Sequence, residues 1–135
     1  MTLLPIIAGL ALGAGVAMAA RWTGFDRDRS FYPTVLIVVA SYYVLFAVMG
    51  GQALGVELAV AAGFSGLALL GGSGRLWLVG LGLLLHGVFD LLHPAIIDSP
   101  GVPAWWPAFC AAVDIVLGGW VIWVSRRPPC PRVER

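Results

Sequence analysis

The residues best suited to chemistry lie in one octet, His86-Gly-Val-Phe-Asp-Leu-Leu-His93, inside a strongly apolar stretch. Positions 86, 90 and 93 are four and three residues apart, so on a helix all three side chains project from one face. In hydrocarbon the Asp alone costs about 2.5–3.5 kcal/mol on the mildest scale. We therefore expect the octet to belong to a site that offsets this cost.

Three chemistries fit these residue types. His86, Asp90 and His93 could bind a divalent metal, zinc or iron, with Glu57 or Asp114 as a fourth ligand or as a base for metal-bound water. Without a metal, His86, Asp90, Glu57 and Asp114 could act as catalytic acids and bases, because carboxylates packed together in a low dielectric can share a proton. A path for protons or cations is the third chemistry, since ionisable groups within a membrane commonly mark one.

A purely structural use of these groups is the alternative. Each His could simply hydrogen-bond a carboxylate and hold two helices together. Ser41, Tyr42 and Tyr43, midway along an apolar segment, could donate to the cluster or bond only to backbone. Trp105 and Trp106 are expected in an interfacial aromatic belt. The convergence of five ionisable groups, described below, favours a functional site over a structural one.

The composition predicts a membrane protein. Of 135 residues, 60% are apolar and only 11% are charged, whereas a soluble domain has about 25% charged residues. Mean hydropathy is +0.94. The formal net charge of +1 gives no case for a nucleic-acid partner. Cys110 and Cys130 are expected on opposite sides of the bilayer, roughly 30 Å apart, which excludes a disulfide between them.

Apolar periodicity predicts an all-α membrane protein, a five-span transmembrane helix bundle over residues 1–125, with a disordered cytoplasmic tail at 126–135. Gly9 and Gly13 form a small-xxx-small face for close helix packing, and such glycine-rich faces could also support a homo-oligomer. Ser30 is expected to cap the second span. The spans are expected at about 3–20, 31–50, 53–70, 76–97 and 104–124.

The arginines predict the orientation. With five spans, all of them fall on one side of the membrane: Arg21, Arg27, Arg29, Arg75, Arg126, Arg127, Arg132 and Arg135. The positive-inside rule makes that side cytoplasmic, which places the N-terminus outside and the C-terminus in the cytoplasm. No basic residue precedes the first segment, so we expect a retained span and not a cleaved signal peptide.

Depth along the spans brings the ionisable groups together. Counting about 1.5 Å per residue puts His86 and Asp114 near the midplane, with Asp90 and Glu57 roughly 5–8 Å toward the outside. His93 falls about 10 Å out, near the outer boundary. We therefore expect His86 near Asp114 and Asp90 near Glu57, in a pocket that opens outward.

Three segments together resemble a family of small uncharacterised bacterial integral membrane proteins: Gly55-Val-Glu57-Leu-Ala, Leu83-Leu-Leu-His86-Gly-Val-Phe-Asp90-Leu-Leu-His93, and Gly101-Val-Pro-Ala-Trp-Trp-Pro-Ala-Phe-Cys110 with Asp114 four residues on. The resemblance covers roughly the second half of the chain. It implies the fold and the site but no reaction. In related sequences a second His can follow His93; here Pro94 stands there, which weakens a three-His site.

The architecture is also similar to that of the sterol-isomerase and sigma-2-receptor superfamily, small helical membrane bundles with His and acidic residues facing an intramembrane lipid pocket. No motif of this chain is diagnostic of that superfamily.

Two functions are therefore expected from this sequence. The first is a metal-dependent or acid/base enzyme that acts on a lipophilic small molecule entering from the bilayer or the outer face. The alternative is a metal-ion or proton-coupled transport or binding protein, or an accessory membrane subunit. In each case we expect a multi-pass protein of the bacterial inner (plasma) membrane.

Overall fold

The computed structural model of the chain describes residues 3–127, which form helices joined by short connections. Five long helices and one short 3-10 helix follow in order: α1 (Leu4–Thr23), η1 (Phe25–Arg27), α2 (Phe31–Gly50), α3 (Leu54–Gly72), α4 (Leu76–Ile96) and α5 (Trp106–Ser125). The predicted tail at 126–135 lies, from residue 128 on, outside the described residues.

Each of the five long helices is long and apolar enough to cross a membrane. Large apolar side chains such as Leu45, Leu69 and Leu85 are exposed on the outside of the bundle. An apolar exterior of this kind suits contact with lipid. The prediction of an all-α, five-helix membrane protein is therefore confirmed at the level of the fold.

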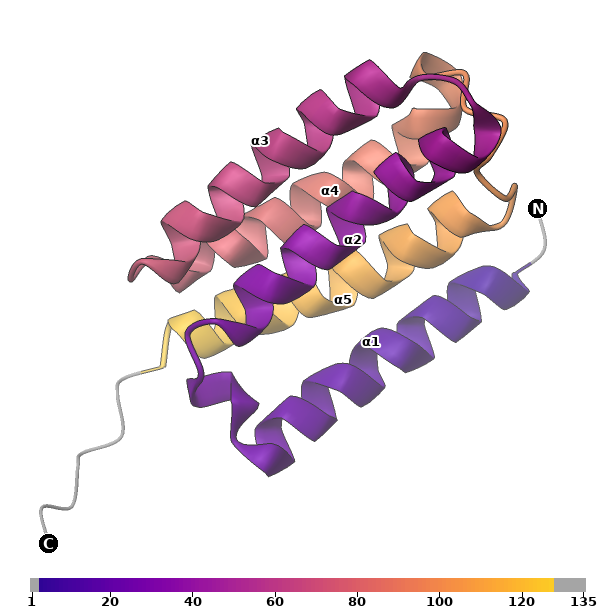
Figure 1. Cartoon of the computed structure of the whole chain (residues 1–135). Helices are drawn as coiled ribbons and strands as arrows, with labels where there is room; N and C mark the ends of the chain where they lie inside the picture. The colour runs from indigo at the N-terminus through magenta and orange to yellow at the C-terminus, as the bar shows by residue number, and fades with distance from the viewer. Residues whose placement is uncertain (1–2, 128–135) are drawn as a thin grey trace, which may run out of the picture.

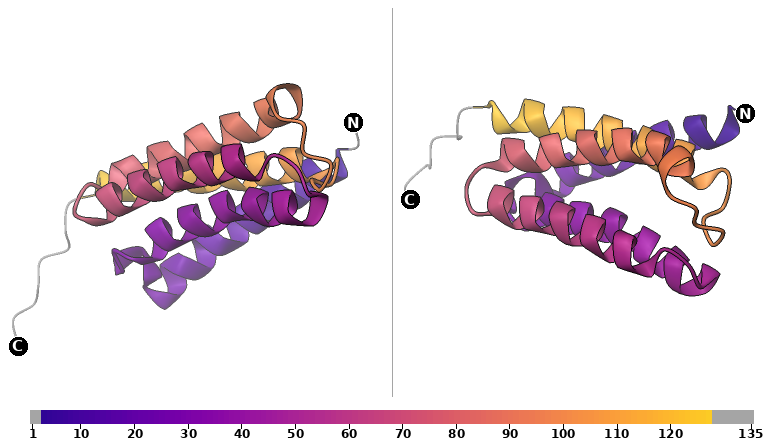
Figure 2. Two further views of the ribbon diagram at one scale, coloured as in Figure 1. Left: turned by 45° about the horizontal axis from the view of Figure 1, so that its top comes forward. Right: turned by 90° about the horizontal axis from the view of Figure 1, so that it is seen from above.

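The helices run up and down, so alternate connections gather at opposite ends (Figure 1). The α1–α2 and α3–α4 connections lie at one end, and the α2–α3 and α4–α5 connections lie at the other. Helix α5 packs against both α1 and α4, and α3 packs against both α2 and α4. Figure 2 shows α4 and α5 side by side over most of their length. Residues on α4 and α5 are therefore placed to form a site together.

Glycines let the helices of the α1–α5–α4 layer approach closely. A Cβ on Gly9 of α1 would lie 2.8 Å from Ala112 Cβ of α5, and one on Gly80 of α4 would lie 2.7 Å from Ile122 Cγ1 of α5. Both distances are shorter than real Cβ contacts, so only glycine fits at these positions. The predicted packing face of Gly9 and Gly13 is therefore confirmed, and α1 uses it inside the bundle.

Local details differ from the prediction in two places. The first helix continues through Arg21 to Thr23 and ends where Gly24 adopts a φ of 83°. Ser30 does not cap α2 as predicted, because its hydroxyl donates instead to Asp28 Oδ1 at 2.7 Å.

The interior of the bundle is divided along its length. Apolar side chains fill the half nearer the α1–α2 connection, among them Leu36, Val79, Leu83, Leu117 and Val121. The polar interior of the described residues consists of Glu57, His86, Asp90, His93 and Asp114. These five side chains are at most 2% exposed. The bundle therefore buries one polar region rather than a polar path along its whole length.

Candidate functional site

Two neighbouring helices each supply a pair of polar side chains spaced four residues apart. His86 and Asp90 come from α4, and Cys110 and Asp114 come from α5. Because residues four apart share a helix face, both pairs project into the same α4–α5 interface. Gly87, beside His86, permits this approach, since a Cβ there would lie only 3.3 Å from the Ala111 carbonyl oxygen. Each of the four side chains offers one potential ligand atom, and these atoms lie within 4.8 Å of one another.

His86 is held between the two carboxylates. Its Nδ1 lies 2.7 Å from Asp114 Oδ2 and 3.5 Å from Asp90 Oδ2. The predicted proximity of His86 and Asp114 is therefore confirmed. The Cys110 thiol lies 3.9 Å from the same Asp114 oxygen. Asp114 thus contacts both the imidazole of His86 and the thiol of Cys110.

Glu57 and His93 form a second buried pair. His93 Nε2 lies 2.6 Å from Glu57 Oε1. Glu57 is in the first turn of α3 and His93 is in the last turn of α4, where the helix dipoles favour an anion and a cation respectively. The sequence predicts that Glu57 lies near Asp90. The hydrogen-bond partner of Glu57 is His93, three residues after Asp90 on α4, because residue counting along a span does not determine the direction in which a side chain points.

Tyr43 of α2 connects the two pairs. Its hydroxyl donates to Asp90 Oδ1 at 2.7 Å, and its ring stacks on the His93 ring with centroids 4.2 Å apart. Of the residues expected near the middle of α2, Tyr43 is therefore a donor to the cluster. Tyr42 is 38% exposed and Ser41 bonds to the backbone of Val38.

The site holds three carboxyl groups and only two imidazoles, all buried. With the three carboxyl groups ionised, its net charge is −1 even when both His are protonated. Within residues 3–127, four of its polar atoms have no hydrogen-bond partner: Glu57 Oε2, His86 Nε2, Asp90 Oδ2 and Asp114 Oδ1. A buried polar atom without a partner costs about 1–3 kcal/mol, and more when charged. A bound cation or proton would offset both the charge and the lost hydrogen bonds.

The donor set of the α4–α5 group suits a transition metal. Imidazole, thiolate and carboxylate are ligands of Zn²⁺, and imidazole and carboxylate also bind Fe²⁺. Metal–ligand distances of about 2.0–2.3 Å put tetrahedral ligand atoms roughly 3.3–3.8 Å apart. The observed spread of 4.8 Å exceeds that by about one ångström, which small side-chain rotations can close.

The ligand set of His86, Asp90 and His93 stays a prediction. His93 shares the buried face of α4 with the other two, as predicted, but it is paired with Glu57 and is not part of the four-residue group. That group includes Cys110, which was not predicted as a site residue. Its spacing of four from Asp114 was the available signal in the sequence.

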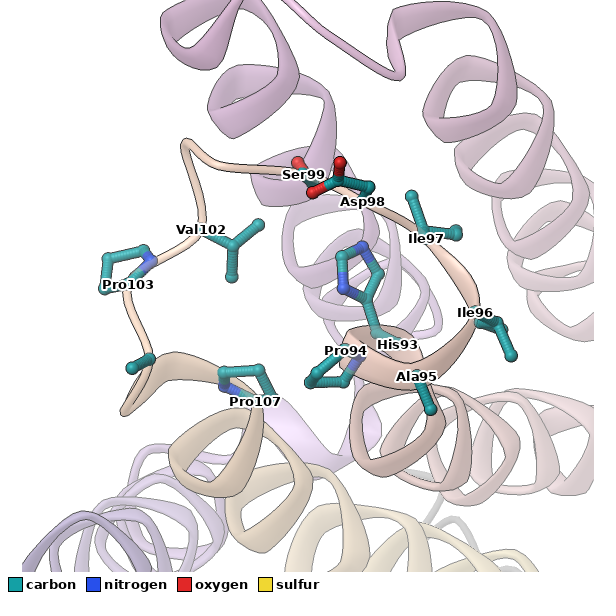
Figure 3. A pocket seen from close by; sticks show the side chains of 11 residues that line it. His93, Pro94, Ala95, Ile96, Ile97, Asp98, Ser99, Val102, Pro103 and Pro107 are labelled. Carbon is teal, nitrogen blue, oxygen red and sulfur yellow. The ribbon is translucent and has the colours of Figure 1, made fainter.

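A cavity of about 600 Å³ opens beside His93, between the end of α4 and the α4–α5 connection. Figure 3 shows the His93 ring beneath the segment that carries Asp98, Ser99 and Val102, with Pro107 of α5 on the opposite wall. The cavity lies at the end of the bundle away from the α1–α2 connection. The sequence predicts that His86, Asp114, Asp90 and Glu57 lie in a pocket that opens outward. The lining of this cavity includes His93 but none of those four residues.

A search against family models, curated proteins and solved structures finds no match to this chain. The resemblance of the Glu57, His86–His93 and Gly101–Cys110 segments to small bacterial membrane proteins stays a prediction.

Proposed function

We propose that this chain is a membrane-embedded metalloenzyme that binds one Zn²⁺ or Fe²⁺ ion between α4 and α5 and acts on a lipophilic small molecule. The observation that carries the proposal is the convergence of His86, Asp90, Cys110 and Asp114, whose donor atoms lie within 4.8 Å of one another in the interior. Such a group without a cation would leave buried carboxylate oxygens and negative charge uncompensated.

The His93–Glu57 pair is proposed to move protons. An imidazole held by a carboxylate is a common general acid or base, and this imidazole lines the cavity. The ion supplies Lewis acidity when bound. Tyr43 holds Asp90 by its hydroxyl and His93 by its ring, so it fixes the position of the acid/base pair relative to the metal group.

The cavity supports a small-molecule substrate. Its volume of about 600 Å³ falls within the range of 300–1,000 Å³ that is usual for ligand pockets. Ile96, Val102 and Pro103 provide apolar walls, while Asp98 and Ser99 provide polar atoms at the rim. These walls favour an amphipathic molecule that enters from the adjoining leaflet.

An enzyme is favoured over a transporter by the distribution of polar groups. A transporter needs polar groups along its whole path. In the described part of the chain, the half of the interior nearer the α1–α2 connection is packed with Leu36, Val79, Leu117 and other apolar residues. A transporter should show proton or metal flux in liposomes that Asp114→Asn abolishes. The enzyme should show no such flux.

Elemental analysis of protein purified gently in detergent tests the metal site. We expect close to one zinc or iron per chain in the wild type and a loss of metal in Asp114→Asn and Cys110→Ser. Glu57→Gln is the matched control, because it also removes a buried acid but lies outside the four-residue group. Less than 0.1 metal per chain in the wild type would contradict the proposal.

We also propose the orientation, with the α1–α2 and α3–α4 connections in the cytoplasm and the N-terminus outside, in the inner membrane of a bacterium. The support is the position of Arg27 and Arg75 in those two connections. Single cysteines at the exposed turn positions Ser73 and Gln52, introduced after Cys110 and Cys130 are replaced, test it with an impermeant maleimide. Only Gln52→Cys should be labelled on intact cells. Labelling of Ser73→Cys alone would show that the protein has the opposite orientation.

Self-association is a further part of this proposal. The faces of Gly9 and Gly80 are used within the bundle, but a Cβ on Gly55 or Gly66 of α3 would meet nothing within 4 Å. These outward-facing glycines are the positions at which a second copy could pack closely. Loss of a cross-linked dimer in Gly66→Leu would support a dimer through α3, and a monomer in wild-type protein would exclude it.

A further inference from the structure

A second cavity, of about 290 Å³, lies at the opposite end of the bundle from the His93 pocket. Three guanidinium-bearing residues line it: Arg27 and Arg29 from the α1–α2 connection and Arg127 from the end of α5. The α3–α4 turn, with Gly72 and Gly74, closes its remaining side. We call this cavity the arginine pocket.

The arginine pocket is positively charged, and its arginines are available. Among residues 3–127 the ion pairs are those of the two histidines, so none of Arg27, Arg29 and Arg127 is paired with an acid there. The single acid in the lining is Asp26, whose Oδ1 already accepts hydrogen bonds from the Tyr32 hydroxyl and from the indole N–H of α5's Trp120. Three cations and one anion give the lining a net charge of +2.

An apolar groove of about 400 Å³ runs between α1 and α5. These two helices lie side by side in Figures 1 and 2. Two indole rings, those of Trp120 and Trp123, line the groove together with smaller apolar residues: Ala14, Ala17, Met18, Val116 and Gly119. A Cβ on Gly119 would meet nothing within 4 Å, so the groove is open along this side of α5. Its lining of apolar side chains suits an acyl chain.

The groove and the arginine pocket meet at α5. Trp123 lines the groove and Arg127 lines the pocket, and the Arg127 guanidinium carbon lies 3.4 Å from the centroid of the Trp123 ring. Trp120 likewise lines the groove while its indole N–H donates to Asp26, which lines the pocket. A cationic pocket at the end of the helices thus lies next to an apolar groove, with the contact between Arg127 and Trp123 joining their linings.

We propose that these two cavities together bind one anionic phospholipid from the leaflet at the arginine-bearing end. The phosphate lies among Arg27, Arg29 and Arg127, and one acyl chain lies along the groove between α1 and α5. Planar guanidinium groups bind phosphate oxygens in pairs, and basic pockets between membrane helices are typical headgroup sites. Trp120 and Trp123 mark the depth at which headgroup gives way to hydrocarbon. The proposal is independent of the metal site.

Native mass spectrometry of the full chain in mild detergent tests the proposal, with phosphatidylglycerol and phosphatidylcholine as probes. The wild type should retain phosphatidylglycerol in preference to phosphatidylcholine. Arg127→Gln should weaken phosphatidylglycerol binding about fivefold, because one basic residue near a membrane surface contributes about that factor. Arg126→Gln is the matched control, since it removes the same charge from the neighbouring residue, which does not line the pocket.

A second variant pair tests the groove. Gly119→Leu places a side chain in the groove at a position where the Cβ meets no protein atom, and should weaken phosphatidylglycerol binding at least fivefold. Gly63→Leu, at an equally open position on α3, should leave it unchanged. Circular dichroism of all four variants should match the wild type. Equal retention of both lipids, or no effect of Arg127→Gln, would overturn the proposal.

A competition experiment with inorganic phosphate distinguishes a lipid site from a site for free phosphate. Displacement of phosphatidylglycerol by millimolar inorganic phosphate, together with normal binding by Gly119→Leu, would show that the pocket takes a free anion and would overturn the lipid assignment.

Discussion

Replacing Tyr43 with Phe removes one oxygen atom from the centre of the polar cluster. The Tyr43 hydroxyl donates to Asp90 Oδ1 at 2.7 Å, and both side chains are buried. The ring would stay, since it stacks on His93 and meets Phe89 edge-on at 5.7 Å. The substitution therefore tests the hydrogen bond and leaves the packing of α2 on α4 in place.

The size of the effect follows from the acceptor and the surroundings. Hydrogen bonds to charged groups contribute about 1.5–3 kcal/mol, whereas bonds between membrane helices average about 0.6 and reach about 1.7 kcal/mol. Loss of the Tyr43 donor leaves Asp90 Oδ1 without a partner, and Asp90 Oδ2 has none among the described residues. We therefore expect the upper end, a loss of about 1.5–2 kcal/mol in the free energy of unfolding, or roughly 30-fold in the unfolding constant at the higher figure.

Unfolding by sodium dodecyl sulfate in mixed micelles, followed by tryptophan fluorescence, measures this loss. Tyr42→Phe is the matched control, because Tyr42 is the adjacent residue, is 38% exposed and packs its ring against Phe46 and Trp106. It should change the free energy by less than about 0.5 kcal/mol. If Tyr43→Phe were as mild as Tyr42→Phe, the Tyr43–Asp90 bond would not exist in the membrane and the assembled cluster would be wrong.

Three further predictions concern the site and the helices that position it. Cys110→Ser should lower metal affinity at least tenfold while helix content is unchanged, as measured by competition with a zinc indicator; equal affinity would remove the thiolate from the ligand set. Glu57→Gln should lower the free energy of unfolding by about 1–3 kcal/mol, since it weakens the buried bond to α4's His93; a neutral effect in the detergent titration would refute that pairing. Gly80→Leu should lower the free energy of unfolding by at least about 1–3 kcal/mol and lower the metal content, because the new side chain forces α4 away from α5. Gly63→Leu should do neither, and similar behaviour of the two variants would contradict the close α4–α5 contact.

The helices could be predicted from the sequence because hydrocarbon imposes a strong and simple pattern. Runs of about 20 apolar residues, separated by Gly50-Gly51-Gln52 and by Gly71-Gly72-Ser73-Gly74, are visible without any knowledge of packing. The ends of the helices were harder to predict, since Arg21 can stay helical while its charged group reaches the membrane–water interface. The Ser30 hydroxyl could accept a hydrogen bond from the first turn of α2 or donate one to a nearby acid, and it donates to Asp28 Oδ1.

The site could be predicted in part. The cost of burying ions in hydrocarbon indicated that Glu57, His86, Asp90 and Asp114 would gather in the interior, and all four are buried. Their depth in the bilayer stays a prediction. The rotation of each helix about its axis is set by packing, so the partners of Glu57 and Asp90 did not follow from the sequence. Cys110 was missed because a lone thiol in an apolar span looks like a small apolar residue until Asp114 is seen on the same face.

X-ray absorption spectroscopy at the zinc or iron edge of the purified protein tests the central claim most directly, because it reports the atoms bound to the metal. A site built from His86, Asp90, Cys110 and Asp114 predicts one sulfur ligand at about 2.3 Å and nitrogen or oxygen ligands at about 2.0–2.2 Å, with the sulfur lost in Cys110→Ser. A shell of oxygen and nitrogen alone in the wild type, unchanged by Cys110→Ser, would contradict the proposed centre.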